Sequence, residues 1–167
     1  MNVIDEAGIL ALSTRLQRLS ERIRKDGQEI YKAMGIHFEP KWFPVIYVLH
    51  RRNTLSVVEI ATEIGYTHPS TITLLKELEK EKLIRSKKDK NDERKRLLQL
   101  SSKGQQLVAE MGPVWEVITA ATADLINTQN NLMKAITEVE EQFLLLSFFQ
   151  RGLQLIKAKE ANVKEDS

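Results

Sequence analysis

The middle of this sequence places two short helices and a hairpin so close together that few folds can accommodate them. Ser56 is a suitable N-cap for a helix over residues 57–64, and Gly65 is a suitable stop for it. A second helix is predicted from Thr67 to about Lys80, with a proline in its first turn, where no backbone N–H is needed. Two short helices joined by a tight glycine turn predict a helix-turn-helix unit.

A cationic hairpin is predicted directly after these helices. Residues 83–88 have the pattern of a strand, residues 89–93 that of a polar turn, and residues 94–100 that of a returning strand with leucines at alternate positions. From Arg85 to Arg96 the chain carries seven cations and three anions, a net charge of +4, whereas the whole chain carries +2. A hairpin in this position is a wing, and its concentrated positive charge favours binding to a polyanion.

Apolar residues recur at helical spacing at both ends of the chain. They predict an amphipathic helix before Gly35 and one continuous helix of about seven turns from Leu132 to Ile156. Between the wing and this helix, another helix begins near Lys103 and should kink at Pro113, which removes one backbone hydrogen bond. Seams of this length predict packing against a partner chain. The predicted dimer-interface residues are Leu12, Leu16, Leu19, Ile136, Val139, Phe143, Leu146 and Leu153.

These elements predict a fold that is mainly α with a small β wing, in which a winged helix-turn-helix head is joined to N- and C-terminal dimerisation helices. We expect one domain over residues 1–167, with the head at 41–104, dimerisation helices at 1–35 and 105–160, and a frayed tail at 161–167. The absence of cysteine excludes disulfides and thiolate metal sites. Neither a membrane-spanning run nor a secretory signal is visible, so we expect a cytoplasmic, nucleoid-associated protein that does not bind a membrane.

The wing and its flanks resemble the MarR family of bacterial regulators. The family's wing has an Asp, a second Asp three residues later, an Arg two residues after that, and a strand that ends in Leu-Thr-x-x-Gly. The corresponding residues here are Asp89, Asp92, Arg94 and Leu100 to Gly104, with Ser101 in place of the Thr. Lys82 replaces the Gly that is customary after the recognition helix, which weakens the expected helix stop slightly, because Lys adopts the left-handed conformation at some cost. The resemblance implies a homodimer, formed by the first and last helices, that binds a pseudo-palindromic DNA site.

The predicted contacts with double-stranded DNA come from the second helix of the helix-turn-helix and from the wing. The exposed side of that helix carries short hydroxyls and a lysine, which can bond base edges or phosphates, and also Glu77. Arg94 is expected in a narrow minor groove, and the resemblance implies that Asp92 holds it there; the alternative for both is an ion pair that stabilises the turn. The predicted DNA-binding residues are His68, Ser70, Thr73, Lys76, Lys87, Lys88, Lys90, Asp92, Arg94, Lys95 and Arg96.

The resemblance also implies an effector that binds between the dimer helices and the head. We expect a small aromatic or amphipathic molecule, although aromatic residues at helical spacing equally predict a core. The candidate lining residues are His37, Trp42, Phe43, Tyr47 and Trp115. The three histidines of the chain are scattered, so neither a metal site nor a cofactor is predicted.

The function that these features favour is sequence-specific regulation of transcription, with repression in response to a ligand as the mode that the resemblance implies. The sequence has no glycine-rich phosphate loop, nucleophile elbow or His-Glu-x-x-His motif, so an enzyme is not predicted. The alternative is a winged-helix scaffold that binds other proteins and does not read DNA. The +4 wing and the polar exposed side of the second helix argue against that alternative.

Overall fold

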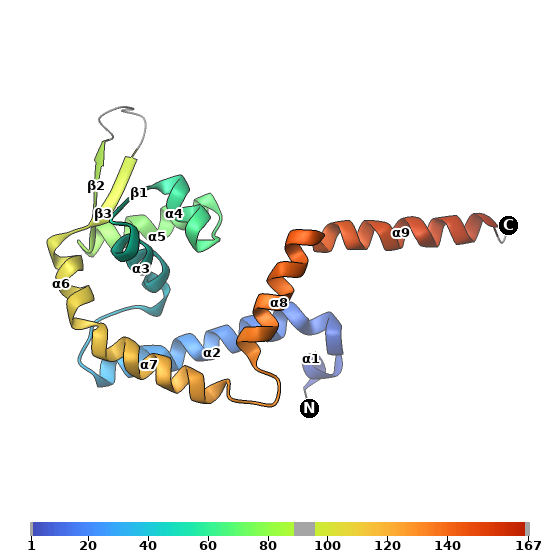
Figure 1. Ribbon diagram of the computed structural model, residues 1–167, viewed down its shortest axis with the longest axis horizontal. Coiled ribbons are helices and arrows are strands. Elements are labelled where there is room, and N and C mark those ends of the chain that lie inside the picture. Colours follow the sequence, from blue (N-terminus) through green and yellow to red (C-terminus); the bar gives the residue numbers. More distant parts are fainter. Residues whose placement is uncertain (1, 89–95, 166–167) are drawn as a thin grey trace. The chain divides into compact units, whose positions relative to one another are not determined.

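The structure, a computed structural model, describes residues 2–88 and 96–165 and confirms the predicted fold class: it is mostly helical with one small sheet (Figure 1). It divides into two compact units, Met1–Ile118 and Thr119–Ser167. The elements in chain order are α1 (Val3–Glu6), η1 (Gly8–Ala11), α2 (Leu12–Ala33), η2 (Pro40–Trp42), α3 (Phe43–Arg52), β1 (Thr54–Ser56), α4 (Val57–Ile64), α5 (His68–Lys80), β2 (Ile84–Lys88), β3 (Arg96–Leu100), α6 (Ser102–Glu110), α7 (Gly112–Leu125), α8 (Leu132–Leu145) and α9 (Phe148–Glu165).

The helix-turn-helix of α4 and α5 lies where the sequence predicts it. The Ser56 hydroxyl accepts the Glu59 N–H at 3.3 Å, and the Glu59 carboxylate accepts the Ser56 N–H at 2.7 Å, which together form a capping box at the start of α4. Gly65 ends α4 with a φ of 70°, a conformation that a residue without a side chain adopts at low cost. Thr67 then caps α5, as expected.

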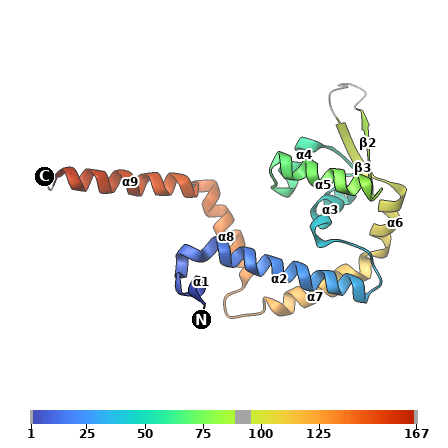
Figure 2. The same cartoon turned by 180° about the vertical axis from the view of Figure 1, so that it is seen from behind.

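The wing belongs to a three-stranded antiparallel sheet in the order β1-β3-β2, and Figure 2 labels its strands β2 and β3. Leu98 and Leu100 of β3 are buried, as their alternation predicts, and Ile84 of β2 pairs with Leu100. Strand β1 pairs with β3 through Leu55 opposite Leu98. The sequence did not predict β1, because a strand of three residues is too short to leave a periodic pattern.

The wing motif joins the end of α5 to the start of α6. Lys82 adopts the left-handed conformation with a φ of 60°, so the helix stop is kept without the customary Gly, and the Leu83 N–H donates to the Leu78 carbonyl at 3.0 Å. The Ser101 hydroxyl caps α6 and donates to the Lys82 carbonyl at 2.6 Å. A Cβ atom on Gly104 would lie 2.1 Å from the Leu83 carbonyl oxygen, so the helix can approach this backbone only with glycine there.

The core of the first unit is built around the helix-turn-helix. The side chains of Val45 and Ile46 in α3, Ile60 in α4, Leu78 in α5 and Leu98 in β3 are completely buried. The buried side of α5 consists of Thr71, Leu74, Leu75 and Leu78, as predicted. Since these residues come from α3, α4, α5 and β3, their packing sets the position of α5.

The helix predicted to begin near Lys103 is interrupted just before Pro113, where the sequence predicts a kink. Helix α6 ends at Glu110, and α7 begins at Gly112. Met111 lies between them and is completely buried, so the break is anchored in the core.

The continuous helix predicted from Leu132 to Ile156 is wrong in one respect: it is interrupted between α8 and α9. Leu146 is extended, with a φ of −156° and a ψ of 122°. The Ser147 hydroxyl accepts the Gln150 N–H at 3.2 Å, and the Gln150 side chain accepts the Ser147 N–H at 2.9 Å. This reciprocal capping starts a new helix. Within the part of the chain that the structure describes, no helix combines the length and the apolar character needed to cross a bilayer.

Candidate nucleic-acid interface

Helix α5 presents a polar side that is free for contacts with a ligand. The four predicted DNA-binding residues of this helix, His68, Ser70, Thr73 and Lys76, are all exposed. The Thr73 hydroxyl donates to the Pro69 carbonyl at 3.1 Å, which leaves its oxygen lone pairs and its methyl group for other contacts. A hydroxyl acceptor, a methyl group and an ammonium on one helix side suit the donors, thymine methyls and phosphates of a DNA groove.

The first turn of α5 is fixed by its own side chains. Thr67 Oγ1 accepts the Ser70 N–H at 3.3 Å and lies 2.9 Å from the Ser70 hydroxyl. The buried Thr71 hydroxyl donates to the Thr67 carbonyl at 3.0 Å. The start of α5 is therefore held in one conformation, and free backbone N–H groups at a helix start favour an anion.

Two carboxylates near the end of α5 face other elements of the head. Glu77, expected on the exposed side, accepts Trp42 Nε1–H at 2.7 Å and pairs with Lys41 Nζ at 2.8 Å. The hydrogen bond from Lys41, and next that from Trp42, hold the pKa of Glu77 below its ordinary value. Glu79 forms an ion pair and hydrogen bonds with the Arg96 guanidinium of β3. Both carboxylates are therefore paired with a cation within the head.

The wing's described cations lie on β2 and β3. Of the predicted phosphate contacts, Lys87 and Lys88 are exposed, and the exposed Arg85 lies on the same strand. Arg96 is exposed but already paired with Glu79, a contact that sequence reasoning did not foresee. The other predicted DNA-binding residues of the wing lie outside the described residues: Lys90, Asp92, Arg94 and Lys95.

The five candidate effector residues fall into two groups. Phe43 and Tyr47 stack with ring centroids 5.2 Å apart, and both rings meet the edge of Trp115 at 5.9 Å and 5.8 Å. His37 and Trp42 instead line a separate pocket of about 380 Å³ beside α6. Trp42 is buried, whereas Phe43 and Tyr47 are exposed.

Trp115 is the most unusual member of the aromatic group. Its indole nitrogen is buried, with the Tyr31 side chain as a polar neighbour. His50, which the sequence analysis did not include, lies 6.3 Å from the Trp115 ring. Burial raises the pKa of Tyr31, and the neighbouring Trp115 opposes that effect.

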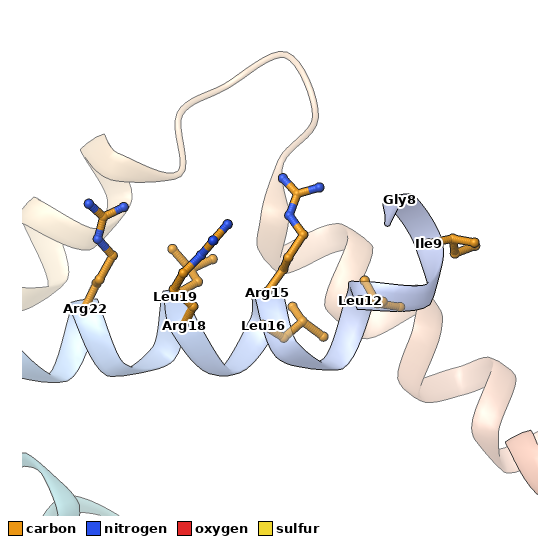
Figure 3. Close-up of a pocket in the computed structure, with 8 residues that line it drawn as sticks. All are labelled: Gly8, Ile9, Leu12, Arg15, Leu16, Arg18, Leu19 and Arg22. Carbon is orange, nitrogen blue, oxygen red and sulfur yellow. The ribbon is translucent and has the colours of Figure 1, made fainter. Parts of the chain in front are cut away.

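The helices at the two ends of the chain expose the predicted dimer residues. Leu12, Leu16 and Leu19 of α2 line an open groove of about 610 Å³, flanked by Arg15, Arg18 and Arg22 (Figure 3). In the second unit, Val139 and Phe143 of α8 are more than half exposed, and Leu153 of α9 is exposed as well, while Ile136 and Leu146 are half-buried.

The comparisons with known proteins agree with this architecture. The model of the MarR family matches residues 35–95, which covers the helix-turn-helix and most of the wing. This match and the fold confirm the resemblance that the wing motif predicts. A comparison with curated proteins gave no match.

Three solved structures illustrate the similarity of fold. The transcriptional regulator MOSR of M. tuberculosis, in complex with DNA, superposes with a TM-score of 0.66 at 15% identity and covers 78% of this chain and 93% of its own. The MepR–DNA complex of S. aureus gives 0.62 at 18% identity and covers 80% and 97%. BpsR of Bordetella bronchiseptica, whose DNA binding is regulated by 6-hydroxynicotinic acid, gives 0.56 at 22% identity and covers 77% and 98%.

Proposed function

We propose that this MarR-like chain is a transcription regulator, and not an enzyme, that reads double-stranded DNA as a homodimer. The observation that carries the proposal is the single head in which the polar side of α5 is joined to a cationic wing. Thr73 and Lys76 would contact base edges or phosphates, and Lys87 and Lys88 would contact phosphates. The DNA complexes of MOSR and MepR support this use of the fold.

The wing would add attraction that does not depend on sequence. Arg94 is our candidate for the minor groove, with Asp92 beside it in sequence, and Lys90, Lys95 and Arg96 would add phosphate contacts. Arg96 would have to exchange its Glu79 partner for a phosphate or share it. Because several cations take part, we expect binding to fall steeply as the salt concentration rises.

The exposed seams of the end helices support a homodimer. The apolar stripe of α2 is flanked by Arg15 and Arg18, which both pair with Asp5, and by Arg22, whereas Glu138 and Glu140 stand next to Val139 in the sequence of α8. Opposite charges beside two uncovered apolar surfaces favour the pairing of α2 in one copy with α8 in the other. A two-fold dimer would present two reading helices, which requires two half-sites about one helical turn apart.

A small effector would regulate the binding. The exposed Phe43–Tyr47 stack, which meets the ring of Trp115, favours a flat aromatic ligand. BpsR, which responds to an aromatic acid, supports this class. Repression is the proposed mode because occupancy of an operator is sufficient to block a promoter.

A selection from a random DNA library at near-physiological salt tests the function. We expect enrichment of an inverted repeat, and we expect Thr73→Ala and Arg94→Ala each to weaken binding to it. In Arg94→Ala the loss should come without a change in the thermal midpoint. Enrichment of no sequence by a folded dimer would contradict the proposal and favour the scaffold that binds proteins.

A further inference from the structure

Helix α5 is held to the rest of the head by two ionic contacts on different sides. Glu77 faces Trp42 and Lys41 in η2, and Glu79 faces Arg96 in β3. Two residues along a helix are about 200° apart, so the two carboxylates point to nearly opposite sides of the axis. Apolar packing is not directional, whereas a hydrogen bond is. The two contacts therefore add a directional restraint on the rotation of α5 to the packing of its buried leucines.

The Glu77 contact also reaches back to the end of α2. Trp42 is buried, and its ring meets the ring of Phe38 edge-on at 5.7 Å. Phe38 in turn contacts the ring of Tyr31 in α2 at 4.9 Å. A continuous series of buried aromatic rings thus connects α2 with the indole N–H that Glu77 accepts.

We infer that Glu77 is a positioning residue for DNA reading, because through Trp42 it fixes the polar side of α5 relative to the end of α2. The inference rests on the proposed function. If α2 forms the dimer, this contact helps set the rotation and spacing of the two reading helices. Lys41 neutralises the carboxylate, so Glu77 can serve this role without repelling phosphate.

The direction in which a Glu77 substitution changes DNA binding distinguishes a positioning role from a simple effect of charge. The change Glu77→Ala removes a negative charge from the reading helix, which by itself strengthens attraction to DNA. A positioning role predicts instead that the variant prefers the operator over random duplex less strongly than the wild type does. We expect this preference to fall by about tenfold, the size expected when a hydrogen bond to a charged group is lost. Binding to random duplex should stay equal or rise.

The test uses the full chain, the operator from the library selection and fluorescence anisotropy well below the thermal midpoint of each variant. Trp42→Phe keeps an aromatic ring in the core but removes the N–H, and it should lower the preference in the same direction. Glu77→Gln keeps an acceptor and should restore most of it. A variant with both Glu77→Ala and Trp42→Phe should prefer the operator as strongly as Glu77→Ala alone, because both changes remove the same hydrogen bond.

Glu29→Ala is the matched control. It removes the same charge and a similar lysine pair, Glu29 with Lys32 at 2.8 Å, from the exposed surface of α2. We expect it to leave the operator preference unchanged.

The outcomes separate the inference from the proposed function. A wild-type protein that binds its operator, together with a folded Glu77→Ala variant of equal or higher preference, overturns the inference alone. A lower thermal midpoint with unchanged preference overturns it too, since the residue is then merely structural. Wild-type protein that enriches no operator overturns the proposed function and this inference with it.

Discussion

The winged head and the end helices use their apolar residues in opposite ways. Helix α3 buries four of its ten residues, whereas α8 buries none of its fourteen and α2 buries only Tyr31 among twenty-two. Both α3 and α8 have a periodic apolar side, so periodicity alone does not distinguish them. The difference teaches that the head is completed by its own chain, while the end helices carry surfaces that a second copy would complete.

The largest effect should come from a methyl group added to a glycine of the head. In Gly104→Ala the new Cβ would lie 2.1 Å from the Leu83 carbonyl oxygen, which already accepts hydrogen bonds from the Ser101 N–H and the Ser101 hydroxyl. We expect a loss of about 3 kcal/mol or more in the free energy of unfolding, measured by urea denaturation. Gly27→Ala in α2, where a Cβ meets nothing within 4 Å, should gain about 0.5–1 kcal/mol. An equal change in the free energy of unfolding for the two variants would contradict the difference in packing between the head and α2.

A charge placed in the seam of α8 should have the next largest effect, on assembly and not on the head. Phe143 is 57% exposed in the single chain, so Phe143→Asp should cost little there but should bury an unpaired charge in a dimer. We expect light scattering to report a monomer with a folded head. Thr137→Asp, which introduces the same charge at an exposed position of α8, serves as the control and should remain dimeric. A Phe143→Asp variant that is still dimeric would place the interface elsewhere.

Removing a helix cap should lower the stability of the head by a smaller amount, and only when the cap belongs to the head. Ser56 and Ser147 both form reciprocal caps, at the start of α4 and of α9. Ser56→Ala should lower the stability of the head by about 1 kcal/mol, because α4 is part of its core. Ser147→Ala should leave the head's thermal midpoint unchanged. A fall of similar size in both variants would show that α9 and the head unfold as one unit.

The smallest expected effect is on how the thermal midpoint of the head depends on pH in the acidic range. The pKa of Glu77 is lowered by Lys41 and Trp42, so its stabilising contribution is complete above the ordinary value of 4.5 and is lost as the pH falls through the lowered pKa. Glu77→Gln should therefore flatten the decline of the head's thermal midpoint below about pH 4.5. The pKa of Asp5 is lowered in the same way, chiefly by its hydrogen bond with Arg18, but this pair lies at the chain end. Asp5→Asn should leave the head's pH dependence as it is.

The head could be predicted from the sequence because its signals are local. Ser56, Gly65 and Thr67 each act on the few residues that follow or precede them, and their caps and turns formed as expected. The continuous helix after Leu132 was wrong because apolar periodicity continues through residues 146 and 147. The Ser147 and Gln150 pair is a capping signal that could have revealed the break.

The site was predictable in part, for a similar reason. The exposure of Thr73 and Lys76 follows from the helical spacing of α5, which is a local property. The partner of Glu77 lies 35 residues away, and that of Glu79 lies 17 residues away. No spacing rule connects residues so far apart, since only the packing of the head brings them together.

The molar mass of the complex between the protein and its selected duplex, measured by light scattering, tests the dimeric reading head most directly. We expect two chains of 19.2 kDa on each duplex, and one chain with weaker affinity on a duplex cut to a single half-site. One chain per full-length duplex, bound as tightly as to the half-site, would contradict the division into a reading head and dimerising ends.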